Sequence, residues 1–185
     1  MTVWLLALVL LPLMAGAAES AGELALGDAL PRLKGEFLTG RTAVLPEAAA
    51  GRVTLLLLGF TYDSRFAVEA WAKRFLEQFK ADPRVTFYEV PMIGGLARMG
   101  KWFINGGMRR GTPKEDYEHV ITVYGGADPW KRRVGFRDPD AAYLILLDGN
   151  GRVAWRYSGG LDEKVFQALS SEVSRLLPGT PHDHP

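Results

Sequence analysis

The sequence predicts an α/β domain in which a central mixed sheet is flanked by helices. Two runs of consecutive apolar residues, 53–60 (VTLLLLGF) and 142–147 (AYLILL), have the pattern of strands that are covered on both faces. A helical pattern follows the first run. The second run is followed by a turn at 149–151 (GNG) and by another strand pattern at 152–157. Strands and helices in this order favour one layered domain.

Further elements follow from local composition. The segment 85–90 (VTFYEV) is rich in β-branched and aromatic residues and is predicted to be a strand that Pro91 ends. A third core strand is expected over 120–124, and a short strand or hairpin over 33–40. Helical segments are predicted for 66–80, 128–135 and 162–177. Phe66, Ala70, Phe75 and Phe79 are predicted to form much of the apolar face of the helix over 66–80, with Trp71 beside it.

Residues 94–118 form a helical insertion before the third core strand. Two glycine pairs, 94–95 and 106–107, bracket a helical pattern over 96–105, and a second short helix is expected from 114, after a Thr-Pro start. Apolar and aromatic groups with a basic rim suit a partner helix or a membrane interface. The alternative is that the helix covers one face of the sheet. The candidate partner surface consists of Met99, Lys101, Trp102, Phe103, Arg109 and Arg110.

The chain contains no cysteine in 185 residues. The strand over 53–60 runs through a turn into a helix, and this is where a thioredoxin-type oxidoreductase carries Cys-x-x-Cys, with one thiol activated near the helix N-terminus. Ala142 also stands where such proteins place a cis-proline, six residues before Asp148. Dithiol exchange requires two thiols, so the chain cannot perform it. We therefore expect a thioredoxin-like fold without thiol chemistry.

The last third of the chain carries a more specific pattern. A tyrosine-containing strand leads to Asp148-x-x-Gly151-Arg152, then to Trp155 and to a Ser-Gly pair at 158–159. Upstream, 51–55 (GRVTL) and a Trp-x-x-x-Phe pair at 71 and 75 fit the same pattern. Over roughly 50–175 the chain resembles the mitochondrial ATP synthase assembly factors, chaperones that help to build the membrane sector of the synthase. This resemblance implies a redox-inactive thioredoxin-like domain that binds a protein partner.

The turn at 61–66 is the candidate loop site. Tyr62, Asp63, Ser64 and Arg65 offer a phenol, a carboxylate, a hydroxyl and a guanidinium near a helix N-terminus, which can hold an anion or a substrate carbonyl. The alternative is that Asp63 or Ser64 caps the helix. No histidine lies nearby in sequence to serve as a base for Ser64.

The N-terminal segment has the pattern of a secretory signal peptide. An apolar stretch over 4–14 (WLLALVLLPLM) is followed by Ala15-Gly16-Ala17, a small-residue cleavage pattern. We expect export to the periplasm or cell envelope, with cleavage near Ala17; an uncleaved anchor is the alternative. The expected organisation is a signal peptide over 1–17, an N-terminal extension over 18–50, the thioredoxin-like domain over 51–178 and a tail over 179–185.

Charge and histidine content limit the remaining function classes. The net charge is +1, which argues against electrostatic binding to nucleic acid. His182 and His184 in the tail are weak metal ligands, because a terminal tail rarely has fixed geometry. No cofactor is expected.

The favoured function is non-catalytic binding of a protein partner, as a chaperone or assembly-type factor that acts at the membrane or in the envelope. The alternative is a small-ligand or anion binder, or an enzyme, that reuses the cysteine-free loop over 61–66.

Overall fold

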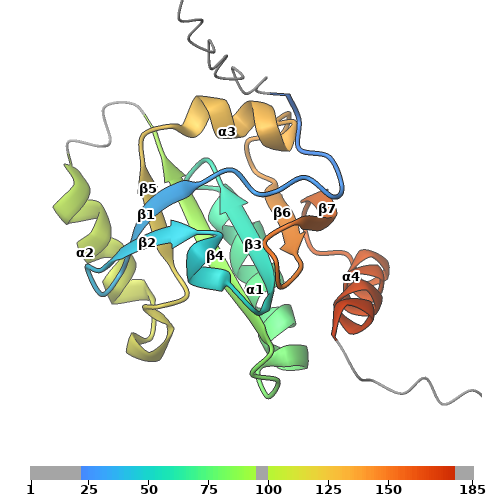
Figure 1. Cartoon of the computed structure of the whole chain (residues 1–185). Coiled ribbons are helices and arrows are strands. Elements are labelled where there is room, and N and C mark those ends of the chain that lie inside the picture. Colours follow the sequence, from blue (N-terminus) through green and yellow to red (C-terminus); the bar gives the residue numbers. More distant parts are fainter. Residues whose placement is uncertain (1–21, 95–99, 178–185) are drawn as a thin grey trace, which may run out of the picture.

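One mixed sheet organises the residues that the structure, a computed structural model, describes: 22–94 and 100–177, without the side chains of 101–103. Its seven strands run in the spatial order β2-β1-β5-β4-β3-β6-β7 (Figure 1). The strands are β1 (Leu33–Phe37), β2 (Thr42–Leu45), β3 (Val53–Gly59), β4 (Val85–Ile93), β5 (Ile121–Tyr124), β6 (Ala142–Leu147) and β7 (Val153–Gly159). The predicted fold class, a central mixed sheet flanked by helices, is confirmed.

The helices connect successive strands, except the last helix, which follows the final strand, as the pattern predicts. They are α1 (Ser64–Phe79), α2 (Lys101–Gly111), α3 (Ala127–Val134) and α4 (Glu163–Leu176), with short 3-10 turns η1 (Glu47–Ala49) and η3 (Lys114–Asp116). Asp162 caps α4, because its carboxylate accepts hydrogen bonds from the backbone N–H groups of Lys164 and Val165.

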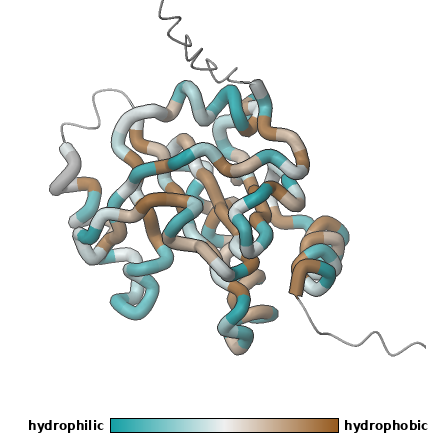
Figure 2. The backbone as a smooth tube through the Cα atoms, in the orientation of Figure 1, coloured by the Kyte–Doolittle hydropathy of each residue, from teal (hydrophilic) through white to brown (hydrophobic). Residues whose placement is uncertain are grey.

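Strand β3 is buried on both faces, which explains its unbroken apolar sequence. Leu55 and Leu57 belong to the apolar cluster that α1 and α4 cover, whereas Leu56 and Leu58 belong to the cluster under α3. β3 pairs in parallel with β4 and antiparallel with β6, so it has no free edge. Figure 2 shows that hydrophobic residues are concentrated in these central strands.

The predicted apolar face of α1 is partly wrong. The buried residues of α1 are Ser64, Val68, Trp71, Ala72 and Phe75. Phe66 is 59% exposed, because it lies off this stripe on the solvent side of the first turn. Trp71 is fully buried, and its indole N–H donates a hydrogen bond to the carbonyl of Gly159 at the end of β7 (3.2 Å).

Two predicted boundaries also differ. β4 does not end at Pro91, because Met92 and Ile93 pair with β5 and extend the strand. α2 runs to Gly111 and passes through the glycine pair at 106–107. The expected second helix from Lys114 is a single 3-10 turn without a side-chain cap.

The Asp148-x-x-Gly151-Arg152 pattern builds part of the scaffold. Asp148 closes the predicted turn by accepting the backbone N–H groups of Asn150 and Arg152, each at 2.9 Å. The guanidinium of Arg152 donates to the carbonyl of Gly27 (2.9 Å), which holds the N-terminal segment beside β7. The β6–β7 hairpin that the sequence predicts is therefore confirmed.

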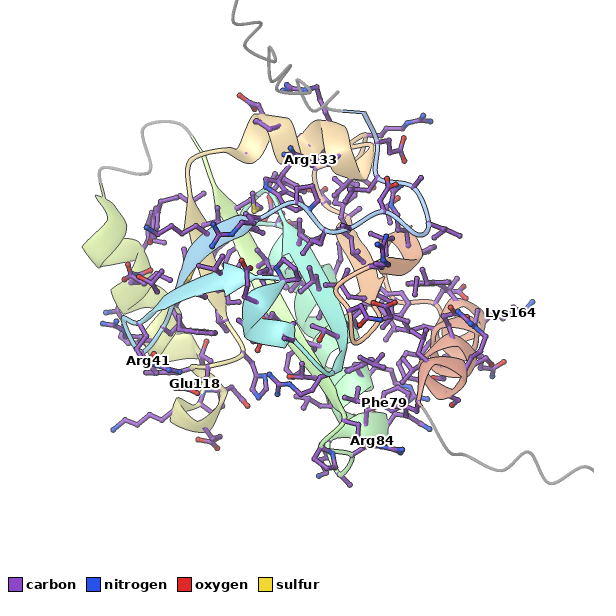
Figure 3. All side chains as sticks on the ribbon, viewed as in Figure 1. Arg41, Phe79, Arg84, Glu118, Arg133 and Lys164 are labelled. Atoms are coloured by element: carbon purple, nitrogen blue, oxygen red, sulfur yellow. The ribbon has the colours of Figure 1, made fainter. Side chains whose placement is uncertain are left out.

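The hairpin β1–β2 joins the sheet through β5. Arg41 at its turn pairs with Glu118 before β5 at 2.5 Å, and Figure 3 shows the two side chains side by side. The proposed signal peptide and the tail from 179 lie outside the described residues. Among the helices that are described, none is long and apolar enough to cross a membrane.

Candidate functional site

The turn between β3 and α1 is fixed by Thr61 and Ser64. The Thr61 hydroxyl accepts the backbone N–H of Ser64 (3.0 Å) and donates to the carbonyl of Pro139 (2.7 Å). Ser64 is buried, and its own hydroxyl donates to the carbonyl of Thr61 (2.9 Å). Asp63 makes no side-chain cap. The expected cap by Asp63 or Ser64 is therefore wrong: Thr61 caps the helix.

The same contacts limit the chemistry of the turn. A buried, hydrogen-bonded Ser64 hydroxyl is not placed to attack a substrate. Space is also tight, because a Cβ at Gly59 would lie 2.8 Å from Ser64 Oγ. The end of β3 and the start of α1 thus form a rigid support for the side chains around them.

Tyr62, Arg65 and Phe66 form an exposed aromatic and cationic cluster on this support. The Arg65 guanidinium lies 4.0 Å from the ring centre of Tyr62 and 4.5 Å from that of Phe66. Both rings are largely exposed, at 71% for Tyr62 and 59% for Phe66. The stacking gives Arg65 a defined place at the surface.

A cleft of about 690 Å³ lies between this turn and α2. Its walls come from four elements: the β3–α1 turn, the start of α1, the second half of β4 and the described half of α2. Tyr62 and Arg65 line its mouth, and Val68, Met92, Ile104 and Met108 contribute apolar walls. Its volume falls within the range of ligand sites in proteins.

Two carboxylates line the cleft, whose walls are mainly apolar. Glu69 comes from α1 and Glu89 from the middle of β4. Burial, together with the nearby negative charges of Glu69 and Asp116, raises the pKa of Glu89 from its ordinary value to about 7, and burial is the largest of these causes. No hydrogen-bond donor or cation among the described side chains reaches this carboxylate.

The described half of α2 is packed on the sheet. Asn105 accepts a hydrogen bond from the Tyr124 hydroxyl (2.7 Å), and Met108 sulfur accepts one from Thr122 (3.6 Å). Arg109, which was expected at a partner surface, donates to the carbonyl of Leu38 (2.6 Å). α2 therefore covers part of one sheet face and forms a wall of the cleft.

The remaining members of the predicted partner surface are only partly described by the structure. Arg110 is exposed. Met99 and the side chains of Lys101, Trp102 and Phe103 lie outside the described residues, so their surface role stays a prediction. His182 and His184 also lie outside, and no group of potential metal ligands occurs within the described part of the chain.

Comparisons with solved structures agree with the fold. A protein assigned as the thiol:disulfide interchange protein DsbE from Chlorobium tepidum matches with a TM-score of 0.58 and 18% identity, over 83% of this chain and 99% of its own. The thioredoxin domain of a thiol-disulfide oxidoreductase from Bacteroides vulgatus matches with a TM-score of 0.53 and 20% identity, over 82% and 99%. The chain has a thioredoxin-like fold.

Other thioredoxin-like structures extend the comparison. The exposed lipoprotein thioredoxin Etrx1 of Streptococcus pneumoniae matches with a TM-score of 0.51 and 14% identity, over 76% of this chain and 99% of its own. No protein-family model and no curated protein matches the sequence. The comparisons support the fold, and they do not extend to the ATP synthase assembly factors.

The residues predicted from the sequence include members of the β3–α1 turn that line this cleft. They do not include Glu89 of β4, which lies at its floor. Tyr62 and Arg65 were selected because they follow β3, and both line the cleft. Glu89 was not selected, although it is the one carboxylate inside the predicted strand over 85–90. A charged residue within an apolar strand was the signal that pointed to it.

Replacement of Thr61 tests the support of the loop. Thr61→Val removes both the helix cap and the hydrogen bond to Pro139, so we expect it to lower the free energy of unfolding by about 1–2 kcal/mol. Thr61→Ser retains the hydroxyl and should remain near the parent. Urea unfolding measures both variants; equal stability of the valine and serine variants would contradict the assigned cap.

Glu89 gives the protein a specific pH dependence. Its pKa is higher in the folded chain than in the unfolded chain, so the folded state binds more protons between about pH 4.5 and 7. Stability should therefore fall as the pH rises through this window, by roughly 3 kcal/mol for a rise in pKa from 4.5 to about 7. The stability of the Glu89→Gln variant should not show this decrease. Urea unfolding at pH 5 and pH 8 measures it, and the same slope in both proteins would contradict this account.

Proposed function

We propose that this protein is a non-catalytic, thioredoxin-like binding protein of the cell envelope that holds an apolar segment of a partner polypeptide in the cleft between α1 and α2. The observation that carries the proposal is the exposed pair Tyr62 and Phe66, whose rings lie against Arg65: Tyr62 and Arg65 line the mouth of the cleft, and Phe66 lies beside it. Aromatic and arginine side chains dominate the binding energy of protein interfaces. A chaperone or assembly role fits a surface of this kind.

The absence of cysteine supports a binding role over thiol exchange. The chain keeps the strand-to-helix turn of the fold, but polar residues occupy it and the sequence contains no thiol. The buried Ser64 hydroxyl is engaged with Thr61, which argues against an acyl-transfer role for this loop. The cleft thus offers surface and charge for binding, without an available nucleophile in the turn.

The two carboxylates that line the cleft limit the kinds of small ligand that it could bind. An anion in the cleft would meet Glu69 and Glu89, while Arg65 is stacked on two rings at the mouth. This charge pattern disfavours an anionic ligand. The volume of about 690 Å³ still suits a neutral or cationic small molecule, which remains the second candidate.

Envelope location is supported by the N-terminal pattern. The apolar stretch over 4–14 and the small residues at 15–17 are typical of a secretory signal. One protein that shares the fold, the exposed lipoprotein thioredoxin Etrx1, carries a name that associates it with such a location.

Alanine substitutions at the mouth test the proposed function. Tyr62→Ala and Phe66→Ala should each weaken binding to immobilised apolar peptides about tenfold, which corresponds to the loss of one strong interface contact. Both side chains are mainly exposed, so the thermal midpoint should barely move. Biolayer interferometry and thermal unfolding provide the two readouts.

Leu26→Ala is the matched control, since Leu26 is 67% exposed and does not line the cleft. It should leave peptide binding unchanged. Equal binding by the Tyr62, Phe66 and Leu26 variants would reject the mouth of the cleft as the binding surface.

A further inference from the structure

The position of Glu89 requires an explanation beyond packing. On β4 it alternates with Tyr88 and Val90, which face the other side of the sheet, and it lies opposite Leu57 of β3. An apolar side chain there would complete the wall of the cleft at lower cost, because a partly buried carboxylate without a partner is destabilising. A ligand that pairs with the carboxylate would offset this cost.

The charged side chains that raise the pKa of Glu89 are both negative. Glu69 on α1 and Asp116 on η3 are close enough to raise its pKa by charge repulsion. Arg65 also lines the cleft, but its guanidinium lies against the rings of Tyr62 and Phe66. His119 is stacked on Phe87 at 4.7 Å, and its Nδ1 lies 3.1 Å from the Phe87 carbonyl. The described groups therefore leave a negative potential in an apolar cleft.

We propose that the cleft accepts a lysine or arginine side chain that a partner polypeptide presents between apolar residues, with its cationic end at Glu89 and Glu69. This inference rests on the proposed function and specifies the occupant of the same site. The apolar walls, including Ile104 and Met108, suit the aliphatic stem of such a side chain. The residues on either side of it would contact Tyr62 and Phe66 at the mouth.

A polypeptide accounts for more of the surface than a small amine does. An ammonium group would satisfy Glu89 and Glu69, but it would leave the exposed ring of Tyr62 at the mouth of the cleft and that of Phe66 beside it uncovered. A segment with apolar residues around one basic residue covers both features at once. Charge complementarity with the two carboxylates selects a basic residue over an acidic one.

Binding of such a segment depends on pH with a defined sign. The cation pairs with ionised Glu89, and the fraction ionised rises from about 0.1 at pH 6 to about 0.9 at pH 8 for a pKa of about 7. Affinity should therefore rise about tenfold over this range. A neutral side chain at the same place should gain nothing from the higher pH.

The test compares three capped peptides that differ only at the central position. The probe is SLFKLFS, and its controls carry norleucine or glutamate in place of lysine. Calorimetric titration of the full chain at pH 6 and pH 8 should give about tenfold tighter binding of the lysine peptide at pH 8. At that pH the lysine peptide should also exceed the norleucine peptide about tenfold, and the glutamate peptide should bind most weakly.

Substitutions at the floor of the cleft separate charge from shape. Glu89→Gln should abolish both the pH dependence and the preference for lysine while the norleucine peptide still binds, which also shows that the variant is folded. Glu69→Gln should reduce the preference. Glu77→Gln, an exposed position on α1 that does not line the cleft, should change neither property.

The outcomes distinguish this inference from the function on which it rests. Equal, pH-independent binding of the lysine and norleucine peptides, unaffected by Glu89→Gln, would overturn the cationic occupant and leave a polypeptide-binding cleft. Absence of binding by all three peptides would overturn both proposals. If hexylammonium binds as tightly as the lysine peptide, the cleft is a site for small amines and the polypeptide occupant is rejected.

Discussion

The burial of β3 on both faces and along both edges is the constraint on which the other features depend. It places a rigid strand between β4 and β6 and ends it at Gly59, where the backbone meets Ser64. The close contact sets where α1 starts, and Thr61 secures it. The mouth of the cleft follows directly, because Tyr62 and Phe66 lie on either side of this fixed point. A looser strand end would leave the two rings without a defined spacing around Arg65.

Glu89, at the floor of the cleft, has opposite effects on the stability of the folded chain and on the binding of a cation. Ionised Glu89 in an apolar cleft lowers the stability of the folded chain at neutral pH, and that cost is relieved if a cation binds beside it. A site of this kind is a poor choice for packing and a good one for recognition. The sequence contains no thiol, and the cleft presents charge and apolar surface for binding.

The elements that the sequence predicted best are the strands that are buried on both faces. Consecutive apolar residues predicted β3 and β6 because both strands are covered on both faces, and a Gly-Asn-Gly turn predicted the last hairpin. Helix faces were harder to predict. Phe66 is apolar and yet exposed, whereas the polar Ser64 is buried because Thr61 satisfies its hydrogen bonds.

Long-range contacts account for the other differences. The glycine pair at 106–107 suggested a break, but hydrogen bonds that Tyr124 and Thr122 of β5 donate to Asn105 and Met108 hold the helix in place through it. Pro91 suggested the end of a strand, but pairing with β5 extends β4 to Ile93. The cleft itself depends on how α1, β4 and α2 meet, which no local pattern contains. In the sequence, Tyr62 and Arg65 after β3 indicated the mouth of the cleft, and the isolated glutamate at position 89 was the signal for its floor.

The central claim is that the mouth of this cleft contacts a partner polypeptide, and photocrosslinking in the cell envelope tests it most directly. A benzophenone amino acid at position 66 should form an adduct with a defined polypeptide, and mass spectrometry should place the crosslink beside a lysine or arginine among apolar residues. The same probe at Leu26, which is also exposed but lies outside the cleft, should not form this adduct. No adduct at position 66, or the same adducts at both positions, would contradict the account.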